Sequence, residues 1–451
     1  MAVRVRSGPV LRRGAMAVVL ALTAAAIGIG SMGAATESED IPRGPHGAAT
    51  MEYQQKLLDK LVADMDVTQP PPEFDPVIWN AFIPEGNEMT ARRVALGRQL
   101  YFDTRLSSDG TVSCATCHDV TRAFTDQQKV SEGVEGQLGQ RNAPTVMNAA
   151  LLQSLFWDGR SPSLDHQARF PIINPIEMGM PDHEAVVQKV KGIPEYRKAF
   201  KEAYGREVTS EDIGKAIGAF ERTMVFMDSP FLRFLQGDTH AISAEARAGW
   251  ELFNGRARCN ACHPINPSNP LGSDNRFHNV GVSARHQDFE ALSDRALKAM
   301  EEDASEEAVD ELAVGTDLSE LGRFMVTKNR AEMGSFRTPI LLNIGITPPY
   351  MHDGSMKTLW DVMDHYNKGG ESNPFLDGGI EPLALTESEI DQVVALLFTM
   401  TDDRFADQNQ AQFEQQRAIA RKERPFRDKS VAFRDMLLFE QRVAGPKGLS
   451  Q

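Results

Sequence analysis

The sequence predicts a mainly α-helical protein with long connecting loops, organised as two similar halves. Strand signals are scarce along its 451 residues. Helix starts are well marked: residues 209–212 offer a capping threonine and two acids ahead of an apolar run through Ile213, Ile217 and Phe220. The two halves are predicted from a segment that returns 145 positions later in the chain.

The repeated segment connects an apolar stretch to a cysteine. Residues 97–102 (Gly-Arg-Gln-Leu-Tyr-Phe) lead to Cys114, and residues 249–253 (Gly-Trp-Glu-Leu-Phe) lead to Cys259. Each half of the chain can therefore form a domain around its own copy. We place the boundary between the two domains near residues 228 to 242.

The first 35 residues predict export. Arginines precede an apolar run at about residues 15–29, and small residues follow at 33–35, which is the pattern of a signal peptide cleaved near Ala35. A membrane anchor is the alternative, but the run is shorter than the roughly 20 residues that span a bilayer. We therefore expect a periplasmic protein without stable membrane insertion. The expected segments are a signal peptide (1–35), a leader and linker (36–72), a first domain (73–235), a second domain (236–402) and a polar helical extension (403–451).

Composition and charge exclude several classes of protein. The formal charge of −15 opposes binding to phosphate backbones, so nucleic acid is not an expected partner. Four cysteines are too few for disulfides to hold so long a chain together. The acidic stretch at 301–311 is predicted to be a solvated surface segment, since that is what a charge run usually means.

All four cysteines fall in two C-x-x-C-H motifs. Two cysteines at this spacing can bond to the two vinyl groups of one haem, and the adjacent histidine then meets the iron. Zinc would need four ligands per site, whereas each motif offers three. A thioredoxin-like pair explains neither the histidine nor the repetition. The sequence therefore predicts two cytochrome-c-like domains with one covalently bound haem c each, attached at Cys114, Cys117 and His118 and at Cys259, Cys262 and His263.

Further motifs resemble those of the bacterial di-haem cytochrome c peroxidases. The first half carries Arg-Asn-Ala-Pro-Thr at 141–145, Phe-Trp-Asp-Gly-Arg at 156–160 and Asn-Pro-Ile-Glu-Met at 174–178. The second half carries Phe-Arg-Thr-Pro at 336–339 and Pro-Tyr-Met-His-Asp-Gly at 349–354. The resemblance runs from about residue 95 to 400. It implies an oxidoreductase that reduces hydrogen peroxide.

The resemblance also implies roles for single residues around the first haem. Glu177 corresponds to the family's acid/base, which takes a proton from hydrogen peroxide and returns it to the leaving oxygen. Gln167 is its polar companion. Trp157 is similar to the tryptophan that carries electrons between the two haems.

A calcium ion is a further expectation from the resemblance. Asn142 and the backbone carbonyls of Thr347 and Pro349 resemble the family's calcium site between the haems. Oxygen ligands of this kind suit a hard cation. Asn142, Thr347 and Pro349 are thus the candidate calcium ligands.

Two departures separate this chain from the ordinary peroxidases. Residues 136–140 lack the histidine that caps their first haem, so we expect that iron to be five-coordinate or to hold water. The methionine that ligates their second haem is replaced by Tyr366, fourteen positions after His352, as in the MauG enzymes of methylamine utilisation. A phenolate should favour high-valent iron. Met363, one helical turn earlier, and His365 are the alternative ligands.

Three functions follow from these motifs. The first is peroxide reduction with electrons from a small cytochrome c or a cupredoxin. The second is MauG-like oxidation of side chains in a partner protein, although Ala257 stands where the MauG enzymes carry a surface tryptophan. The third is a non-enzymatic electron-transfer cytochrome, with both irons fully ligated by the protein.

Overall fold

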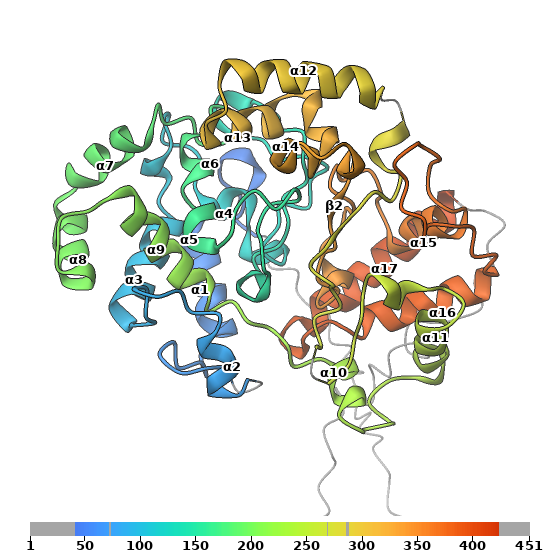
Figure 1. Ribbon diagram of the computed structural model, residues 1–451. Helices are drawn as coiled ribbons and strands as arrows, with labels where there is room; N and C mark the ends of the chain where they lie inside the picture. Colours follow the sequence, from blue (N-terminus) through green and yellow to red (C-terminus); the bar gives the residue numbers. More distant parts are fainter. Residues whose placement is uncertain (1–40, 72–73, 268, 286–287, 424–451) are drawn as a thin grey trace, which may run out of the picture. The chain divides into compact units, whose positions relative to one another are not determined.

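Helices and loops form nearly all of the described chain (Figure 1). The computed structural model describes residues 41–71, 74–267, 269–285 and 288–423. Within these residues the one sheet is the short antiparallel pair of β1 (Phe277–His278) and β2 (Phe336–Arg337), with Phe277 opposite Arg337. The prediction of a mainly α protein is therefore confirmed. The predicted signal peptide lies outside the described residues.

The first ten α-helices lie before residue 236. They are α1 (Met51–Leu61), α2 (Pro76–Asn80), α3 (Ala91–Tyr101), α4 (Cys114–Cys117), α5 (Leu164–Gln167), α6 (Phe170–Ile173), α7 (His183–Lys191), α8 (Pro194–Tyr204), α9 (Ser210–Glu221) and α10 (Pro230–Leu235). The seven that follow are α11 (Ala244–Asn254), α12 (Phe289–Glu302), α13 (Glu306–Gly315), α14 (Phe324–Thr327), α15 (Leu359–Asn367), α16 (Glu387–Phe398) and α17 (Ala406–Glu423).

Short 3₁₀ helices interrupt the loops. They are η1 (Pro45–Gly47), η2 (Thr104–Leu106), η3 (Val120–Arg122), η4 (Val134–Gly136), η5 (Ala149–Leu151), η6 (Cys259–Ala261), η7 (Ser283–Arg285), η8 (Asp317–Leu321), η9 (Arg330–Glu332), η10 (Ile344–Ile346) and η11 (Asp403–Phe405).

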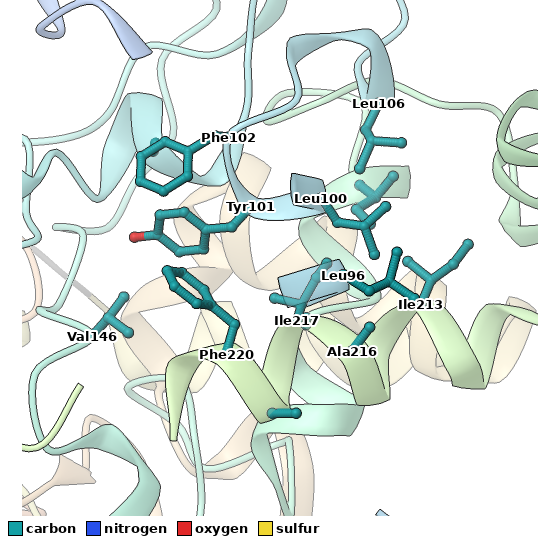
Figure 2. Close-up of a cluster of buried hydrophobic side chains, with 14 of the residues drawn as sticks. Leu96, Leu100, Tyr101, Phe102, Leu106, Val146, Ile213, Ala216, Ile217 and Phe220 are labelled. Atoms are coloured by element: carbon teal, nitrogen blue, oxygen red, sulfur yellow. The ribbon is translucent and has the colours of Figure 1, made fainter. Parts of the chain in front are cut away.

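Helices α3 and α9 cross closely in the first half of the chain. Figure 2 shows Leu96, Leu100 and Tyr101 of α3 directed towards Ile217 and Phe220 of α9. The crossing requires Gly97, because a Cβ atom there would lie 1.8 Å from the carbonyl oxygen of Ala216. The glycine that begins the first copy of the repeat thus allows two helices to touch backbone to backbone.

The second copy of the repeat forms an equivalent contact. Helices α11 and α16 pack together, and a Cβ atom on Gly249 would lie 2.0 Å from the carbonyl oxygen of Gln392. The sequence repeat is therefore also a structural repeat, in which a glycine-containing helix precedes each cysteine motif. The domain boundary near 228–242 remains a prediction.

The acidic stretch is more than a solvated segment. Its second helix, α13, turns exposed Glu306 and Glu307 to solvent but buries Asp310 and Val314. The carbonyl oxygen of Val314 accepts a hydrogen bond from the backbone N–H of Gln140, in the first half of the chain, at 2.9 Å. The prediction of a solvated surface segment is therefore wrong for the inner face of α13.

The segments at both ends of the described chain are anchored by glutamines. Gln54 of α1 is fully buried and donates to the carbonyl oxygen of Ala115, inside the first cysteine motif, at 3.0 Å. Gln416 of α17 accepts from the Tyr350 hydroxyl at 3.2 Å and from the Leu359 backbone at 3.0 Å. No helix of the described chain is long and apolar enough to cross a membrane.

Candidate active site

The first cysteine motif lines a cavity together with the residues expected on its reactive side. We call this space the first cavity. This cavity is bordered by Cys114 and Cys117 of α4 and by His118, the residue that caps the C-terminal end of that helix. Gln167, at the end of α5, and Glu177, in the turn after α6, border the same space. The structure thus brings together predicted site residues that lie up to 63 positions apart in the sequence.

The second cysteine motif lines a separate cavity, which we call the second cavity. Cys259, Cys262, His263 and Tyr366 all border it. Met363 does not line it and belongs to the apolar core, with 3% of its surface exposed. His365 also lies outside it, with Nε2 2.8 Å from the carbonyl oxygen of Val280. Of the three candidate ligands, only Tyr366 shares a cavity with His263.

Both motif histidines are held in the same way. Nδ1 of His118 lies 3.3 Å from the carbonyl oxygen of Phe124, and Nδ1 of His263 lies 2.6 Å from that of Gly272. A carbonyl can only accept, so each Nδ1 donates a proton and each Nε2 keeps its lone pair. Burial lowers the pKa of both imidazoles, which favours the neutral form that binds a metal.

Trp157 and Asn142 border both cavities. Asn142 is buried, and its backbone N–H donates to the carbonyl oxygen of His352 at 2.8 Å. Thr347 and Pro349, the other predicted calcium ligands, line the second cavity alongside it. Among the described residues there is no cluster of three or more His, Cys, Asp or Glu side chains that could hold a metal ion. A calcium ion at this place would depend on amide and carbonyl oxygens.

Glu177 lines the first cavity and has one carboxyl oxygen without a hydrogen-bond partner in the described chain. Its Oε2 is shielded from solvent and has no hydrogen-bond partner among the described residues. Burial, together with the negative charge of Asp310, raises the pKa of Glu177 to about 8, although Arg160 acts in the opposite direction. A carboxyl group with this pKa exchanges its proton near neutral pH, as a group that takes and returns a proton must.

Comparison with known proteins decides the family. Residues 91–240 match the family model described as di-haem cytochrome c peroxidase. Over 319 residues the chain is 36% identical to the methylamine utilization protein MauG of Methylorubrum extorquens, covering 70% of this chain and 80% of that protein. It is 33% identical over 325 residues to the cytochrome c551 peroxidase of Nitrosomonas europaea, covering 72% and 83%.

The chain belongs to the di-haem cytochrome c peroxidase family. It is therefore an oxidoreductase with two haem c groups and with peroxide as its substrate. A crystal structure of a MauG-like protein associated with microbial copper homeostasis matches it with a TM-score of 0.59 and 30% identity, covering 75% of this chain and 95% of that one. The plain electron carrier considered from the motifs alone does not fit a family of enzymes.

The thiol and imidazole groups that line each cavity fit a covalently bound haem. Each cavity carries two free thiols and one histidine whose Nε2 lone pair is available. Glu177, which lines the first cavity, has a shielded Oε2 without a partner in the described residues, and a ligand bound in the cavity would account for this unpaired polar atom. Within the described residues, His118 is the one histidine that lines this cavity.

Two arginines that line the first cavity, Arg141 and Arg160, are paired with buried aspartates, and the sequence motifs gave these pairs no role. Asp158 is fully buried and accepts from Arg141 at 2.7 Å and from Arg160 at 3.0 Å. Burial alone would raise the pKa of Asp158, but the two guanidinium groups lower it to about 2. Arg160 also pairs with Asp310, 150 positions further on. The one sequence signal was Asp310 itself, an acid on the same helix face as Ala313 and Val314.

Three further residues occupy different places relative to the two cavities. His166 lies outside the first cavity and contacts Ser161 at 2.7 Å and Glu306 at 3.2 Å. Ala257 is 4% exposed and lines the second cavity, so this position is internal in the present peroxidase. Glu221 of α9, which no motif pointed to, lines the first cavity with a buried Oε2 that has no partner in the described chain.

Proposed function

We propose that this peroxidase acts in the periplasm, reduces hydrogen peroxide at its first haem and receives electrons from an external redox protein. The first haem would be held by Cys114, Cys117 and His118, and the second by Cys259, Cys262, His263 and Tyr366. The observation that carries the proposal is that Glu177 lines the first cavity and has a buried carboxyl oxygen with no partner in the described residues. The predicted signal peptide supports the location.

Glu177 and Gln167 would carry the proton chemistry. Haem iron supplies the position at which peroxide binds and the electrons that break its O–O bond. Glu177 takes a proton from the near oxygen and delivers it to the far oxygen, which leaves as water. Two electrons and two further protons complete the reduction of one peroxide to two waters. Gln167 orients the peroxide through its amide group.

Trp157 would connect the two haems. Its indole borders both cavities and is fixed by a hydrogen bond to the carbonyl oxygen of Asn142 at 2.9 Å. An aromatic ring in that place offers an intermediate station for an electron that moves between the two sites. We assign Trp157 this role together with its packing role.

Tyr366 would be the second ligand of the second haem. The support is that Tyr366 and His263 line one cavity, whereas Met363 and His365 do not line it. Burial raises the pKa of the Tyr366 phenol, so its anionic form requires a neighbouring cation such as ferric iron. A phenolate oxygen is a hard anionic ligand and lowers the reduction potential relative to a thioether.

A calcium ion bound by Asn142 and the carbonyl oxygens of Thr347 and Pro349 is part of the proposal. All three residues line the second cavity, and Asn142 lines the first as well. Dialysis against a calcium chelator should slow electron exchange between the two haems, and added Ca²⁺ should restore it. Exchange that is unaffected by the chelator, with no calcium found by metal analysis, would remove the ion from the account.

The electron donor is tested by steady-state turnover. We expect rapid peroxide reduction with a reduced small cytochrome c or cupredoxin. MauG-like oxidation of a partner protein is the second candidate, because Tyr366 faces the second cavity and a MauG protein is 36% identical. Slow turnover with every soluble donor, together with lasting oxidation of an exported partner, would favour that second function.

A further inference from the structure

Asp310 contacts Arg160, which lines the first cavity, and Asn174, which lies three residues before Glu177. Its Oδ1 accepts hydrogen bonds from Nε and Nη2 of Arg160 at 2.8 and 2.6 Å. Its Oδ2 accepts from Nδ2 of Asn174 at 2.7 Å. The residue is 2% exposed, so bulk water screens its carboxylate little.

The two partners of Asp310 connect it to Glu177. The backbone carbonyl oxygen of Asn174 accepts from the backbone N–H of Glu177 at 3.2 Å, so Asn174 begins the turn that carries the acid/base. Arg160 lines the first cavity, and its guanidinium lies 3.5 Å from the centre of the Phe156 ring. The Asp310 carboxylate thus binds both Asn174, which begins the turn to Glu177, and the guanidinium of Arg160.

We propose that Asp310 is a positioning residue of the peroxide site: α13 supplies a buried carboxylate that fixes Arg160 and the Asn174–Glu177 turn. The proposal rests on the proposed role of Glu177 as the acid/base. It assigns a task to the acidic stretch at 301–311, which supplies one internal carboxylate from a helix whose other acids face solvent.

The charge of Asp310 has a second consequence for Glu177. The charged groups that act on Glu177 are Asp310 on α13, which raises its pKa, and Arg160 in the loop before α5, which lowers it. Cys114 and Cys117 of α4 also face it and become neutral thioethers on haem attachment. Removing the charge of Asp310 should therefore make Glu177 release its proton at lower pH.

Helix α13 provides a matched control. Glu307 is exposed and lies 3.6 Å from Nε2 of His183, outside the first cavity. Asp310→Asn and Glu307→Gln each remove one negative charge from the same helix. Only the first alters the contacts with Arg160 and Asn174. A change that follows the net charge of the helix would appear in both variants.

The test titrates Glu177 in the ferric holoenzyme without peroxide, by infrared difference spectroscopy of its carboxyl band, assigned through the loss of that band in Glu177→Gln. We expect Asp310→Asn to lower the midpoint by about one pH unit or more. Glu307→Gln should keep the wild-type midpoint, and so should Asp310→Glu, which retains the charge. Visible spectra of both haems report folding, and Asp310→Ser replaces the asparagine variant if that variant does not assemble.

A midpoint that is the same in wild type and Asp310→Asn, or that shifts equally in Glu307→Gln, overturns the proposal. The pH profile of the first peroxide reaction should shift by the same amount as the infrared midpoint. Failure of the proposed function is distinguishable, because Glu177→Gln would then react with peroxide at the wild-type rate. If the midpoint is the same in wild type and Asp310→Asn while Glu177→Gln reacts slowly with peroxide, only the role of Asp310 is contradicted, and the role of Glu177 stands.

Discussion

Trp157 donates its indole N–H to the backbone carbonyl oxygen of Asn142 at 2.9 Å, and both residues border the two cavities. Asn142 in turn donates its own backbone N–H to the carbonyl oxygen of His352 at 2.8 Å. A segment from each half of the chain therefore fixes the wall between the two sites. The indole cannot rotate without losing a largely shielded hydrogen bond.

Replacement of Trp157 by phenylalanine tests whether this indole carries electrons. Phenylalanine retains an aromatic ring but is much harder to oxidise and lacks the N–H donor. We expect transfer between the haems to slow by about tenfold, equivalent to about 1.4 kcal/mol in the barrier. Stopped-flow spectra of the second haem after peroxide addition measure this rate. An unchanged rate would assign Trp157 to packing alone.

Glu177→Gln should slow the cleavage of peroxide by roughly 10²-fold, since a positioned acid/base contributes about that much. Glutamine is nearly isosteric, so both haem spectra should remain intact. Glu184→Gln, an exposed carboxyl on α7, serves as the control and should react at the wild-type rate. Equal rates in both variants and in wild type would remove Glu177 from the mechanism.

The pH dependence of the first peroxide reaction should follow the protonation of Glu177. The raised pKa of about 8 means that this carboxyl gains its proton-accepting form as pH rises through that value. The rate constant should therefore increase with pH and level off above about 8. In Glu177→Gln this increase of the rate constant with pH should be absent. An increase near the ordinary glutamate pKa of about 4.3 would contradict the shielded environment described for Glu177.

Tyr366→Phe and Met363→Leu distinguish the two candidate ligands of the second haem. Tyr366 faces the second cavity, whereas Met363 lies in the apolar core. The phenylalanine variant should alter the second-haem absorption and its electron paramagnetic resonance signal. The leucine variant should leave both unchanged. The opposite pair of results would make Met363 the ligand.

The glycines of the repeat should be intolerant of a methyl group. In Gly249→Ala the new Cβ would meet the Gln392 carbonyl oxygen, so α11 and α16 must separate. We expect a loss of about 1–3 kcal/mol in the free energy of unfolding, measured by denaturant titration. Gly378→Ala is the control, because a Cβ there meets nothing within 4 Å. Equal stability of the two variants would show that the helices adjust freely.

Local patterns in the sequence predicted much of the site. The spacing of Cys114, Cys117 and His118 identifies haem attachment because the covalent chemistry occurs within five residues. The apolar period after residue 209 predicted α9, and the repeated glycine indicated a repeated unit that the structure realises as two helix pairs. Each of these features depends on neighbours close in sequence.

The contacts of Asp310 could not be predicted in that way. Its partner Arg160 is 150 positions away, and its own helix carries mostly exposed acids, so composition indicated a solvated surface. The burial of one acid among them depends on tertiary packing of α13 against the first half of the chain. The same holds for Glu221, which no motif marks and which the fold places in the first cavity.

The central claim is that the first haem is open and reacts with peroxide without prior reduction. The most direct test records optical and electron paramagnetic resonance spectra of the haem-loaded ferric protein before and after one equivalent of hydrogen peroxide. The account predicts a high-spin signal that disappears on mixing. No reaction until one haem is reduced would show that a distal ligand closes the first site, and would contradict it.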